Sequence, residues 1–350
     1  MSRFLSNRLA RLTPYTPGEQ PQDKQYIKLN TNESPFPPSA KALAAAEEEA
    51  CRLELYPDPT CRRLRQALAA QYGVDPDEVV VTNGSDEVLS FAFMAYGDDG
   101  VAFPDITYGF YRVFADLYGL DARLLPLNED FTVDVEAYKG LGRTIVLANP
   151  NAPTGLCLPL TEIEALVAAN PDNVVLIDEA YVDFGGESAV SLIHKYDNLL
   201  VTGTFSKSRS MAGARLGFGI GCKALIQDLE TLRYSTNPYN INRMTLAAGL
   251  GQLADEETTR RNCRTVMETR EYTAARLREL GFTVLPSATN FLFAACPKIG
   301  GKELYRKLKD RGILVRHFDA PRLTDYNRIT IGSREQMDAL LTAIQSILEE

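Results

Sequence analysis

The chain has 350 residues, of which 45% are hydrophobic and 24% charged, an ordinary globular composition with room for about two domains. Its net charge of −9 argues against a nucleic-acid surface, and no apolar run reaches the roughly 20 residues of a membrane helix. We therefore expect a protein that binds neither nucleic acid nor a membrane.

Cysteine and histidine usage narrows the possible sites. The six cysteines show no close CxxC pairing, and the N-terminus lacks the apolar stretch of a signal peptide, so we expect free thiols in a reducing cytoplasm. The chain has two histidines, His194 and His317, which poorly supply a histidine-rich metal site or a serine-protease-like triad. We expect no metal.

Residues 1–33 are rich in proline and polar groups without clear periodicity, and we interpret them as an N-terminal arm laid over the rest of the protein. Residues 34–245 are predicted to form a large domain. Strand-like apolar runs alternate there with helical stretches, at 78–82, 144–148, 173–177 and 198–203. Runs of this kind suit parallel strands covered on both faces. The alternation predicts an α/β fold with a mainly parallel sheet flanked by helices.

One of the intervening helices is predicted over 160–169. Thr161 is its expected N-cap residue, with Glu164 completing a capping box. From residue 246 the pattern changes, and residues 246–350 are predicted to form a smaller α+β domain. A long helical region over 245–280 leads into that domain. Strands are expected there at 282–285, 290–294, 313–316 and 328–331.

Ligands bind beyond the carboxyl ends of the strands in parallel α/β sheets, so the residues that follow each strand are candidates for a site. Gly84 and Ser85 open a helix whose free N–H groups and dipole suit a phosphate, although taken alone they favour an ordinary capped helix. Asn151 stands in a rigid turn fixed by Pro150 and Pro153, which a purely structural role explains equally well.

The next two strand ends carry charge. Asp178 follows a buried strand, where a carboxylate is costly unless it is paired, and a pyridinium nitrogen would be such a partner. A capping carboxylate or a metal ligand are the alternatives. Lys207 stands at the end of the following strand, and a lone lysine is normally a solvated surface group. Here Thr204, Ser206 and Arg215 surround it, as phosphate binding requires, and this favours an aldehyde cofactor held covalently by the lysine.

These residues together resemble the fold-type I pyridoxal-phosphate-dependent transferases, and most closely the histidinol-phosphate aminotransferase family. The segments that carry the resemblance span nearly the whole chain: Lys28-Leu-Asn-Thr-Asn-Glu33, Tyr56-Pro-Asp-Pro, Asn149-Pro-Asn-Ala-Pro-Thr-Gly155, Asp178-Glu-Ala-Tyr181, Thr204-Phe-Ser-Lys207, Ala212-Gly-Ala-Arg215 and Arg328-Ile-Thr-Ile-Gly. The resemblance implies transamination of L-histidinol phosphate with 2-oxoglutarate, which gives imidazole acetol phosphate and glutamate in histidine biosynthesis.

The resemblance also implies a role for each matching position. Lys207 binds pyridoxal 5'-phosphate covalently and later moves the proton, and Asp178 pairs with the pyridine nitrogen. Tyr181 and Asn151 hydrogen-bond the phenolic oxygen of the ring, and Tyr108 stacks on it.

The remaining implied contacts are with phosphate groups and with the substrate. The cofactor phosphate is expected to contact Gly84, Ser85, Thr204, Ser206 and Arg215. In a homodimer, Tyr56 is expected to reach the phosphate of the neighbouring site. The expected substrate contacts are Arg328, which receives the anionic group, and, near it, Arg316 and Tyr15.

Two departures from the family pattern bear on these roles. Ala152 stands before Pro153 where an asparagine is common, and Ser34 stands where the pattern has asparagine after Asn-Glu. An aromatic amino acid aminotransferase and a threonine-phosphate decarboxylase share this scaffold and stay open as alternatives. A cofactor-binding sensor domain of a transcriptional regulator would need a basic DNA-binding segment, which this acidic chain does not display.

Overall fold

The computed structural model describes residues 2–6 and 9–350. Its main element is a seven-stranded sheet with the order β2-β8-β7-β6-β5-β3-β4. All neighbours pair in parallel except β8, which runs antiparallel to β2 and β7. The strands are β2 (Val79–Thr82), β3 (Val101–Pro104), β4 (Ala122–Leu125), β5 (Thr144–Ala148), β6 (Val175–Asp178), β7 (Leu199–Thr204) and β8 (Gly217–Gly221). The predicted mainly parallel α/β sheet is confirmed.

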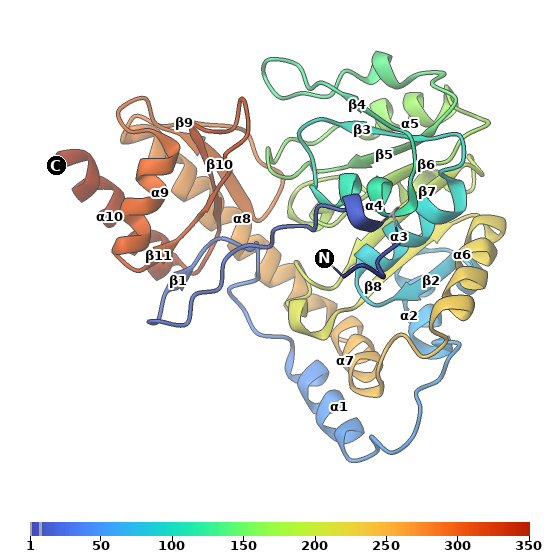
Figure 1. Ribbon diagram of the computed structural model, residues 1–350. Helices are drawn as coiled ribbons and strands as arrows, with labels where there is room; N and C mark the ends of the chain where they lie inside the picture. The colour runs from blue at the N-terminus through green and yellow to red at the C-terminus, as the bar shows by residue number, and fades with distance from the viewer. Residues whose placement is uncertain (1, 7–8) are drawn as a thin grey trace.

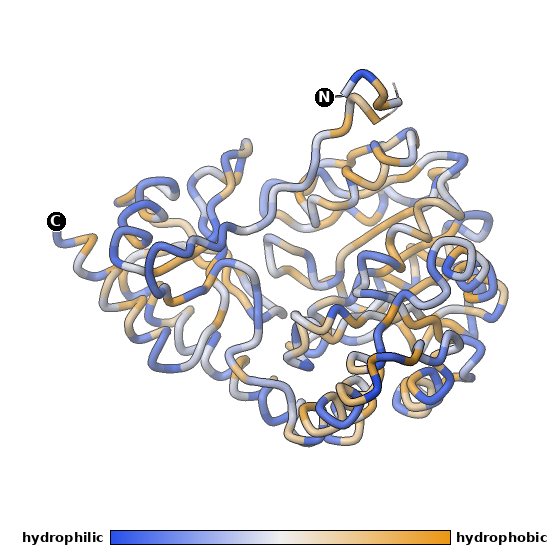
Figure 2. Tube along the Cα trace, turned by 60° about the horizontal axis from the view of Figure 1, so that its bottom comes forward, coloured by the Kyte–Doolittle hydropathy of each residue, from blue (hydrophilic) through white to orange (hydrophobic). Residues whose placement is uncertain are grey.

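Both faces of this sheet are buried, as the continuous apolar runs indicated. Along β6, Val175 and Ile177 belong to one core cluster while Leu176 belongs to another on the opposite face. Helices α2 (Arg62–Tyr72) and α5 (Leu160–Ala168) contribute to the first cluster. Helices α3 (Ser85–Tyr96), α4 (Phe110–Tyr118) and α6 (Lys223–Thr236) cover the second. The hydropathy trace in Figure 2 accordingly shows apolar strands inside more polar helices.

A smaller unit follows in the chain (Figure 1, orange to red). Its antiparallel sheet has the order β12-β13-β10-β9, and the strands are β9 (Thr283–Val284), β10 (Phe291–Ala295), β12 (Arg316–His317) and β13 (Tyr326–Thr330). Helices α8 (Glu256–Glu279), α9 (Gly301–Asp310) and α10 (Arg334–Glu349) pack on it and share its apolar core. This is the α+β architecture expected for the C-terminal part.

The N-terminal arm is tied to the smaller unit. Strand β1 (Ile27–Lys28) pairs in parallel with β11 (Ile313–Leu314), and a short 3-10 turn, Leu9–Arg11, precedes it. Before β1, the dark blue trace in Figure 1 runs from beside α4 of the large unit to the smaller unit. It therefore lies along the gap between the two units.

The helical region predicted over 245–280 is helical, and it consists of two helices. Helix α7 (Arg243–Leu253) ends at Ala254, and α8 begins after Asp255, which has a non-helical backbone. Helix α7 packs lengthwise on α1 (Ala40–Ala50), and its Ala248 belongs to the core under the large sheet. The domain boundary predicted between residues 245 and 246 falls inside α7 and stays a prediction.

Thr161 does not cap α5. The N-cap residue is Pro159, whose backbone is extended, and the helix starts at Leu160 with no side-chain cap. Proline has a fixed φ and no backbone N–H that needs a partner, so it suits the position from which the chain enters the helix. The predicted capping box with Glu164 is therefore wrong, and Glu164 instead pairs with Lys195.

Candidate active site

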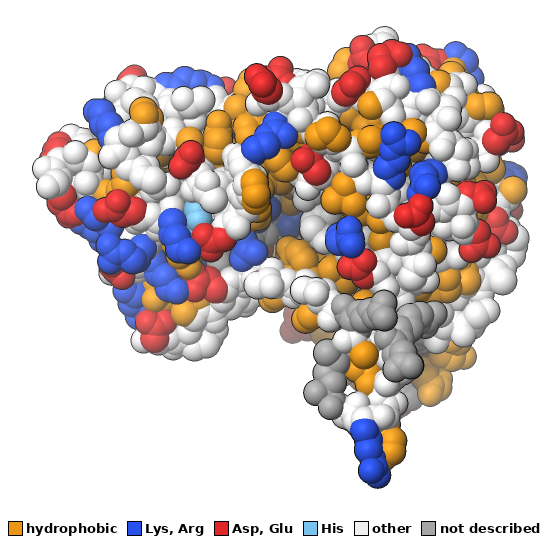
Figure 3. All heavy atoms as spheres, turned by 45° about the horizontal axis from the view of Figure 1, so that its top comes forward, with side chains coloured by type: hydrophobic (Ala, Val, Ile, Leu, Met, Phe, Trp, Pro, Cys, Tyr) orange, Lys and Arg blue, Asp and Glu red, His pale blue; other side chains and the backbone are white. Residues whose placement is uncertain are grey.

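A cavity of about 460 Å³ opens at the carboxyl ends of β6 and β7, between the large sheet, the arm and the smaller unit. Figure 3 shows the molecular surface hollowed between the two units. Among the residues predicted from the sequence, the cavity is lined by Tyr15, Ser85, Tyr108, Asp178, Tyr181, Thr204, Ser206, Lys207, Arg215, Arg316 and Arg328. Residues spread over more than 300 positions of sequence thus share one space.

Asp178 is the last residue of β6 and is buried at the floor of the cavity. Its Oδ2 accepts a hydrogen bond from the Tyr111 hydroxyl at 2.8 Å, and its Oδ1 accepts one from the Ala180 N–H at 3.3 Å. Burial raises the pKa of Asp178 to about 6, although these two hydrogen bonds and the charge of Lys207 act in the opposite direction. A cation placed beside this carboxylate would favour its ionised form.

Lys207 follows β7 and points toward the arm. Its Nζ donates to the Thr31 carbonyl oxygen at 3.3 Å and lies 5.7 Å from the centroid of the Tyr181 ring. The Tyr181 hydroxyl in turn accepts a hydrogen bond from the Asn32 amide at 2.8 Å. The two predicted catalytic side chains Lys207 and Tyr181 therefore lie together and are both contacted by the arm.

A set of hydrogen-bond donors forms a cradle at the start of α3. Gly84 precedes this helix with φ +76°, and no side chain caps the first N–H groups. A Cβ at position 84 would lie 2.6 Å from Nη2 of Arg215, and the positive φ further favours glycine at this position. The other guanidinium nitrogen, Nη1, approaches the Ser206 hydroxyl at 3.4 Å, and Thr204 lines the same wall. Free N–H groups, hydroxyls and an arginine are the donors that a phosphate needs.

Aromatic side chains form one side wall. The Tyr108 hydroxyl donates to Oδ1 of Asp86 at 2.9 Å, and Oδ2 of Asp86 lies 3.4 Å from Nη2 of Arg215. Burial, together with the nearby Asp86 charge, raises the pKa of Tyr108, so this phenol stays protonated. Tyr15 from the arm meets the Tyr108 ring edge-on, with 6.1 Å between the centroids.

The opposite wall carries two arginines of the smaller unit. Arg328 is half-buried on β13, and its Nη2 donates to the Asn30 carbonyl oxygen at 3.1 Å. Its Nε has no hydrogen-bond partner in the described part of the chain. Burial lowers the pKa of the Arg328 guanidinium. Arg316 donates to the carbonyl oxygens of Thr16 and Pro17 at 3.1 and 3.2 Å. Both arginines therefore keep donors for an anion.

Three residues predicted for the site do not line this cavity. Gly84 lies behind Arg215, as described above. Asn151 is buried and accepts from the Thr107 hydroxyl at 2.9 Å while its amide donates to the Ile106 carbonyl oxygen at 3.1 Å. Tyr56 is 76% exposed and stacks on Tyr239 with 4.4 Å between the ring centroids. The predicted roles of these residues stay predictions.

The prediction missed several side chains that share the cavity: Asn30, Asn32, Glu33 and Asp86. A sequence signal for the arm residues exists, because Asn30, Asn32 and Glu33 lie in the segment Lys28-Leu-Asn-Thr-Asn-Glu33 that carries the family resemblance. No group of three or more potential metal ligands occurs among the described residues. Over the same residues, no helix is long and apolar enough to cross a membrane.

Comparison with known proteins identifies the class to which this fold and site belong. The family model of class I and II aminotransferases matches residues 24–344, and the chain therefore belongs to that family. A histidinol-phosphate aminotransferase from Marinomonas sp. is 52% identical over 99% of this chain and 100% of its own length. The predicted family resemblance is thereby confirmed.

Solved structures share the fold. The histidinol-phosphate aminotransferase from Sinorhizobium meliloti in complex with pyridoxal-5'-phosphate has 25% identity and a TM-score of 0.90, and the match covers 100% of this chain and 98% of that one. An L-threonine-O-3-phosphate decarboxylase from Porphyromonas gingivalis, at 23% identity, has a TM-score of 0.83 over 93% of this chain and 100% of that chain. This second likeness concerns the fold alone.

The residues present fit pyridoxal phosphate. The cofactor carries a phosphate, an aldehyde and a ring nitrogen that is basic. The cavity offers a donor cradle with Arg215, a primary amine on Lys207 and a buried carboxylate on Asp178 with its pKa raised. Each chemical group of the cofactor therefore has a complementary group in the cavity.

Proposed function

We propose that the chain is a pyridoxal-phosphate-dependent aminotransferase that transfers the amino group of L-histidinol phosphate to 2-oxoglutarate, giving imidazole acetol phosphate and glutamate. The observation that carries the proposal is the full-length relation, at 52% identity, to a protein of that name. The two arginines with unused donors on one wall of the cavity agree with an anionic substrate.

In this proposal Lys207 and Asp178 have distinct chemical roles. Lys207 binds the cofactor covalently through its amine and, once the substrate has displaced it, takes the proton from the substrate Cα. When bound, pyridoxal phosphate supplies an electron sink for the carbanion that this leaves. Asp178 keeps the ring nitrogen protonated by charge pairing in a buried site. The same amine of Lys207 would hold that proton and could return it during turnover.

Other residues bind and orient. Ser85, Thr204, Ser206 and Arg215 hold the cofactor phosphate, Tyr108 covers the ring, and Tyr181 with Asn151 binds the ring oxygen. Arg328 and Arg316 bind the phosphate of the substrate or the carboxylates of 2-oxoglutarate, because the guanidinium fork suits both groups. Tyr15, which meets the Tyr108 ring, closes the aromatic side of the pocket. The same residues would serve both halves of the reaction, with 2-oxoglutarate as the acceptor of the amino group in the second half.

A panel of amino donors tests the substrate. With 2-oxoglutarate as acceptor, glutamate formation is expected to have a kcat/KM for histidinol phosphate that exceeds that for phenylalanine or tyrosine on the order of a hundredfold, because an unmatched buried arginine is costly. Phosphothreonine should yield no CO₂. Preference for phenylalanine or tyrosine would select an aromatic aminotransferase instead, and CO₂ release from phosphothreonine would select the decarboxylase.

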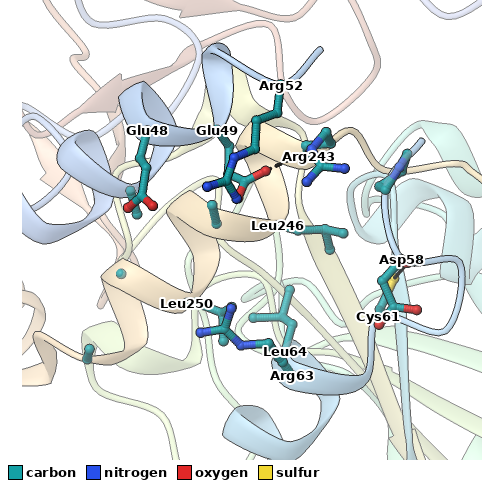
Figure 4. Close-up of a pocket in the computed structure, with 15 residues that line it drawn as sticks. Glu48, Glu49, Arg52, Asp58, Cys61, Arg63, Leu64, Arg243, Leu246 and Leu250 are labelled. Atoms are coloured by element: carbon teal, nitrogen blue, oxygen red, sulfur yellow. Dashed lines mark hydrogen bonds and ion pairs between the residues drawn. The ribbon is translucent and has the colours of Figure 1, made fainter. Parts of the chain in front are cut away.

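We also propose that the enzyme is a cytoplasmic homodimer in which Tyr56 reaches the cofactor phosphate of the neighbouring site. The support is an apolar surface around α1, where large hydrophobic side chains are exposed at Leu43, Leu53, Leu55 and Tyr56. Beside them a cavity of about 550 Å³ opens between α1 and α7, with Leu64, Leu246 and Leu250 on its floor and the pair Glu49–Arg243 above (Figure 4). A monomer would leave this surface in water.

Replacing Tyr56 with phenylalanine is expected to weaken cofactor binding about tenfold without changing the sedimentation coefficient, because one hydrogen bond to a charged phosphate is lost. Titration of the cofactor-free protein with pyridoxal phosphate measures the effect. Tyr234→Phe is the matched control, since that tyrosine is 45% exposed and its hydroxyl contacts the Pro59 carbonyl oxygen. Full activity in a sedimenting monomer would refute the shared site.

A further inference from the structure

Helix α4 places one phenol directly behind the candidate active site. Tyr111 is completely buried, and its hydroxyl donates to Oδ2 of Asp178 at 2.8 Å. Its ring also meets the ring of Tyr108 edge-to-face, with 5.6 Å between the centroids and an interplanar angle of 89°. One side chain therefore contacts both the carboxylate and the aromatic ring that are proposed to face the cofactor.

The surroundings of Tyr111 otherwise consist of phenylalanines. Its ring lies 6.3 Å from that of Phe93 and 5.9 Å from that of Phe103, and Phe114 belongs to the same core. A phenylalanine at position 111 would serve this packing as well. A buried hydroxyl without a partner costs free energy, so its presence in an apolar wall is accounted for only by the bond to Asp178.

Few groups act on Asp178 besides Tyr111. Lys207, which follows β7, stabilises the ionised carboxylate through its charge. The N–H of Ala180, in the segment after β6, donates to Oδ1. From α3, Asp86 destabilises the ionised form, as burial does. The phenol of Tyr111 stays protonated, because burial and the neighbouring carboxylate raise its pKa well above the usual range. Tyr111 therefore acts as a permanent donor, and among the described residues it is the donor to Oδ2.

Resting on the proposed function, we infer that Tyr111 is a positioning residue for the reaction: its hydroxyl holds Asp178 ionised and directed at the ring nitrogen of the cofactor. Oδ2 is anchored by Tyr111 and Oδ1 by the backbone, so the plane of the carboxylate is fixed by two elements, α4 and the segment after β6. The same phenol ring supports Tyr108 from behind, which links the position of the stacking ring to that of the carboxylate.

Tyr111→Phe tests the inference, because it removes one oxygen and keeps the packing. The acid limb of the kcat profile is expected to move to higher pH by about one unit, since the carboxylate loses a donor that favours its ionised form. The affinity of the cofactor-free protein for pyridoxal phosphate should fall about tenfold, and the pH titration of the bound cofactor's visible absorption should shift. Tyr118→Phe is the control on the same helix, where the hydroxyl meets Ser90 at 2.6 Å.

The outcomes separate the possible roles. A lower melting temperature with an unchanged acid limb and unchanged cofactor affinity would make Tyr111 purely structural and overturn the inference. Cofactor affinity and the absorption titration need no substrate, so they decide on Tyr111 even if the donor panel rejects histidinol phosphate. If Tyr111→Phe fails to fold, Tyr111→Met, which lacks a strong donor and fills the site flexibly, is measured in its place and must give the same two shifts.

Discussion

Replacing Lys207 with alanine is expected to lower the rate of transamination on the order of 10⁴-fold or more, because the variant loses both the covalent attachment of the cofactor and the general base. Reduction with borohydride should fix the cofactor to the wild-type chain and leave the variant unlabelled. The binding of pyridoxal phosphate itself should persist at reduced affinity, since the phosphate cradle around Arg215 is untouched.

The matched control is Lys223→Ala. Lys223 opens α6 with a side chain 58% exposed and pairs with Asp75 at 2.9 Å, far from the cavity lining. Its loss should leave turnover and labelling at wild-type values, since exposed ion pairs contribute little to stability. If Lys207→Ala turned over at close to the wild-type rate, the assignment of this lysine, and the proposed mechanism with it, would have to be abandoned.

Asp178→Asn is expected to reduce kcat on the order of 10³-fold, which is the cost of losing a preorganised charge in a buried site. Asparagine nearly matches the shape of aspartate and can still accept the Tyr111 hydrogen bond, but it carries no charge to keep a ring nitrogen protonated. Single-turnover measurements with saturating cofactor check the chemical step. Asp116→Asn is the control and should retain full turnover, because Asp116 is a partly exposed residue of α4 that pairs with Arg112.

The same variant should change how stability depends on pH. Because burial raises the pKa of Asp178 from 3.8 to about 6, the folded cofactor-free protein binds more protons than the unfolded chain between these values. Stability from this group is present below pH 3.8 and is lost as the pH rises through about 6. Melting curves of the cofactor-free Asp178→Asn variant should therefore decline less between pH 4 and 7 than those of the wild type. Parallel curves would contradict the pKa shift.

The residues at the strand ends could be found from the sequence because a parallel sheet brings the carboxyl ends of its strands to one edge. Asp178 and Lys207 follow the neighbouring strands β6 and β7, so local pattern and topology agree there. The antiparallel β8 was not predicted. Its residues, Gly217 to Gly221, are buried as in a strand, but the glycines leave few side chains from which a strand pattern could be recognised. Gly217 is required there, because a Cβ would lie 2.2 Å from the backbone nitrogen of Ser85.

The contribution of the arm to the site could not be predicted from its local sequence. The position of the arm depends on long-range contacts such as the pairing of Ile27 with Ile313, across almost the whole chain, and these contacts bring Asn30 and Thr31 to the cavity. The break between α7 and α8 falls at Ala254 and Asp255, where neither glycine nor proline marks it. Tyr111 is likewise identified only in three dimensions, because its partner lies 67 positions further along the chain.

The hydrogen bonds of Arg316, Arg328 and Lys207 to the arm have an electrostatic consequence. All three cations are met by main-chain carbonyl oxygens, of Thr16, Pro17, Asn30 and Thr31, rather than by carboxylates. A carbonyl is a dipole and cancels no net charge. Among the described residues, the four cationic side chains of the cavity, Arg215 included, outnumber its three carboxylates, Glu33, Asp86 and Asp178, so the cavity attracts anions although the chain carries a formal charge of −9. An incoming anion replaces dipoles and has no ion pair to break. The carbonyls that it displaces belong to the arm, so a bound anion and the arm compete for hydrogen bonds from the same three cations.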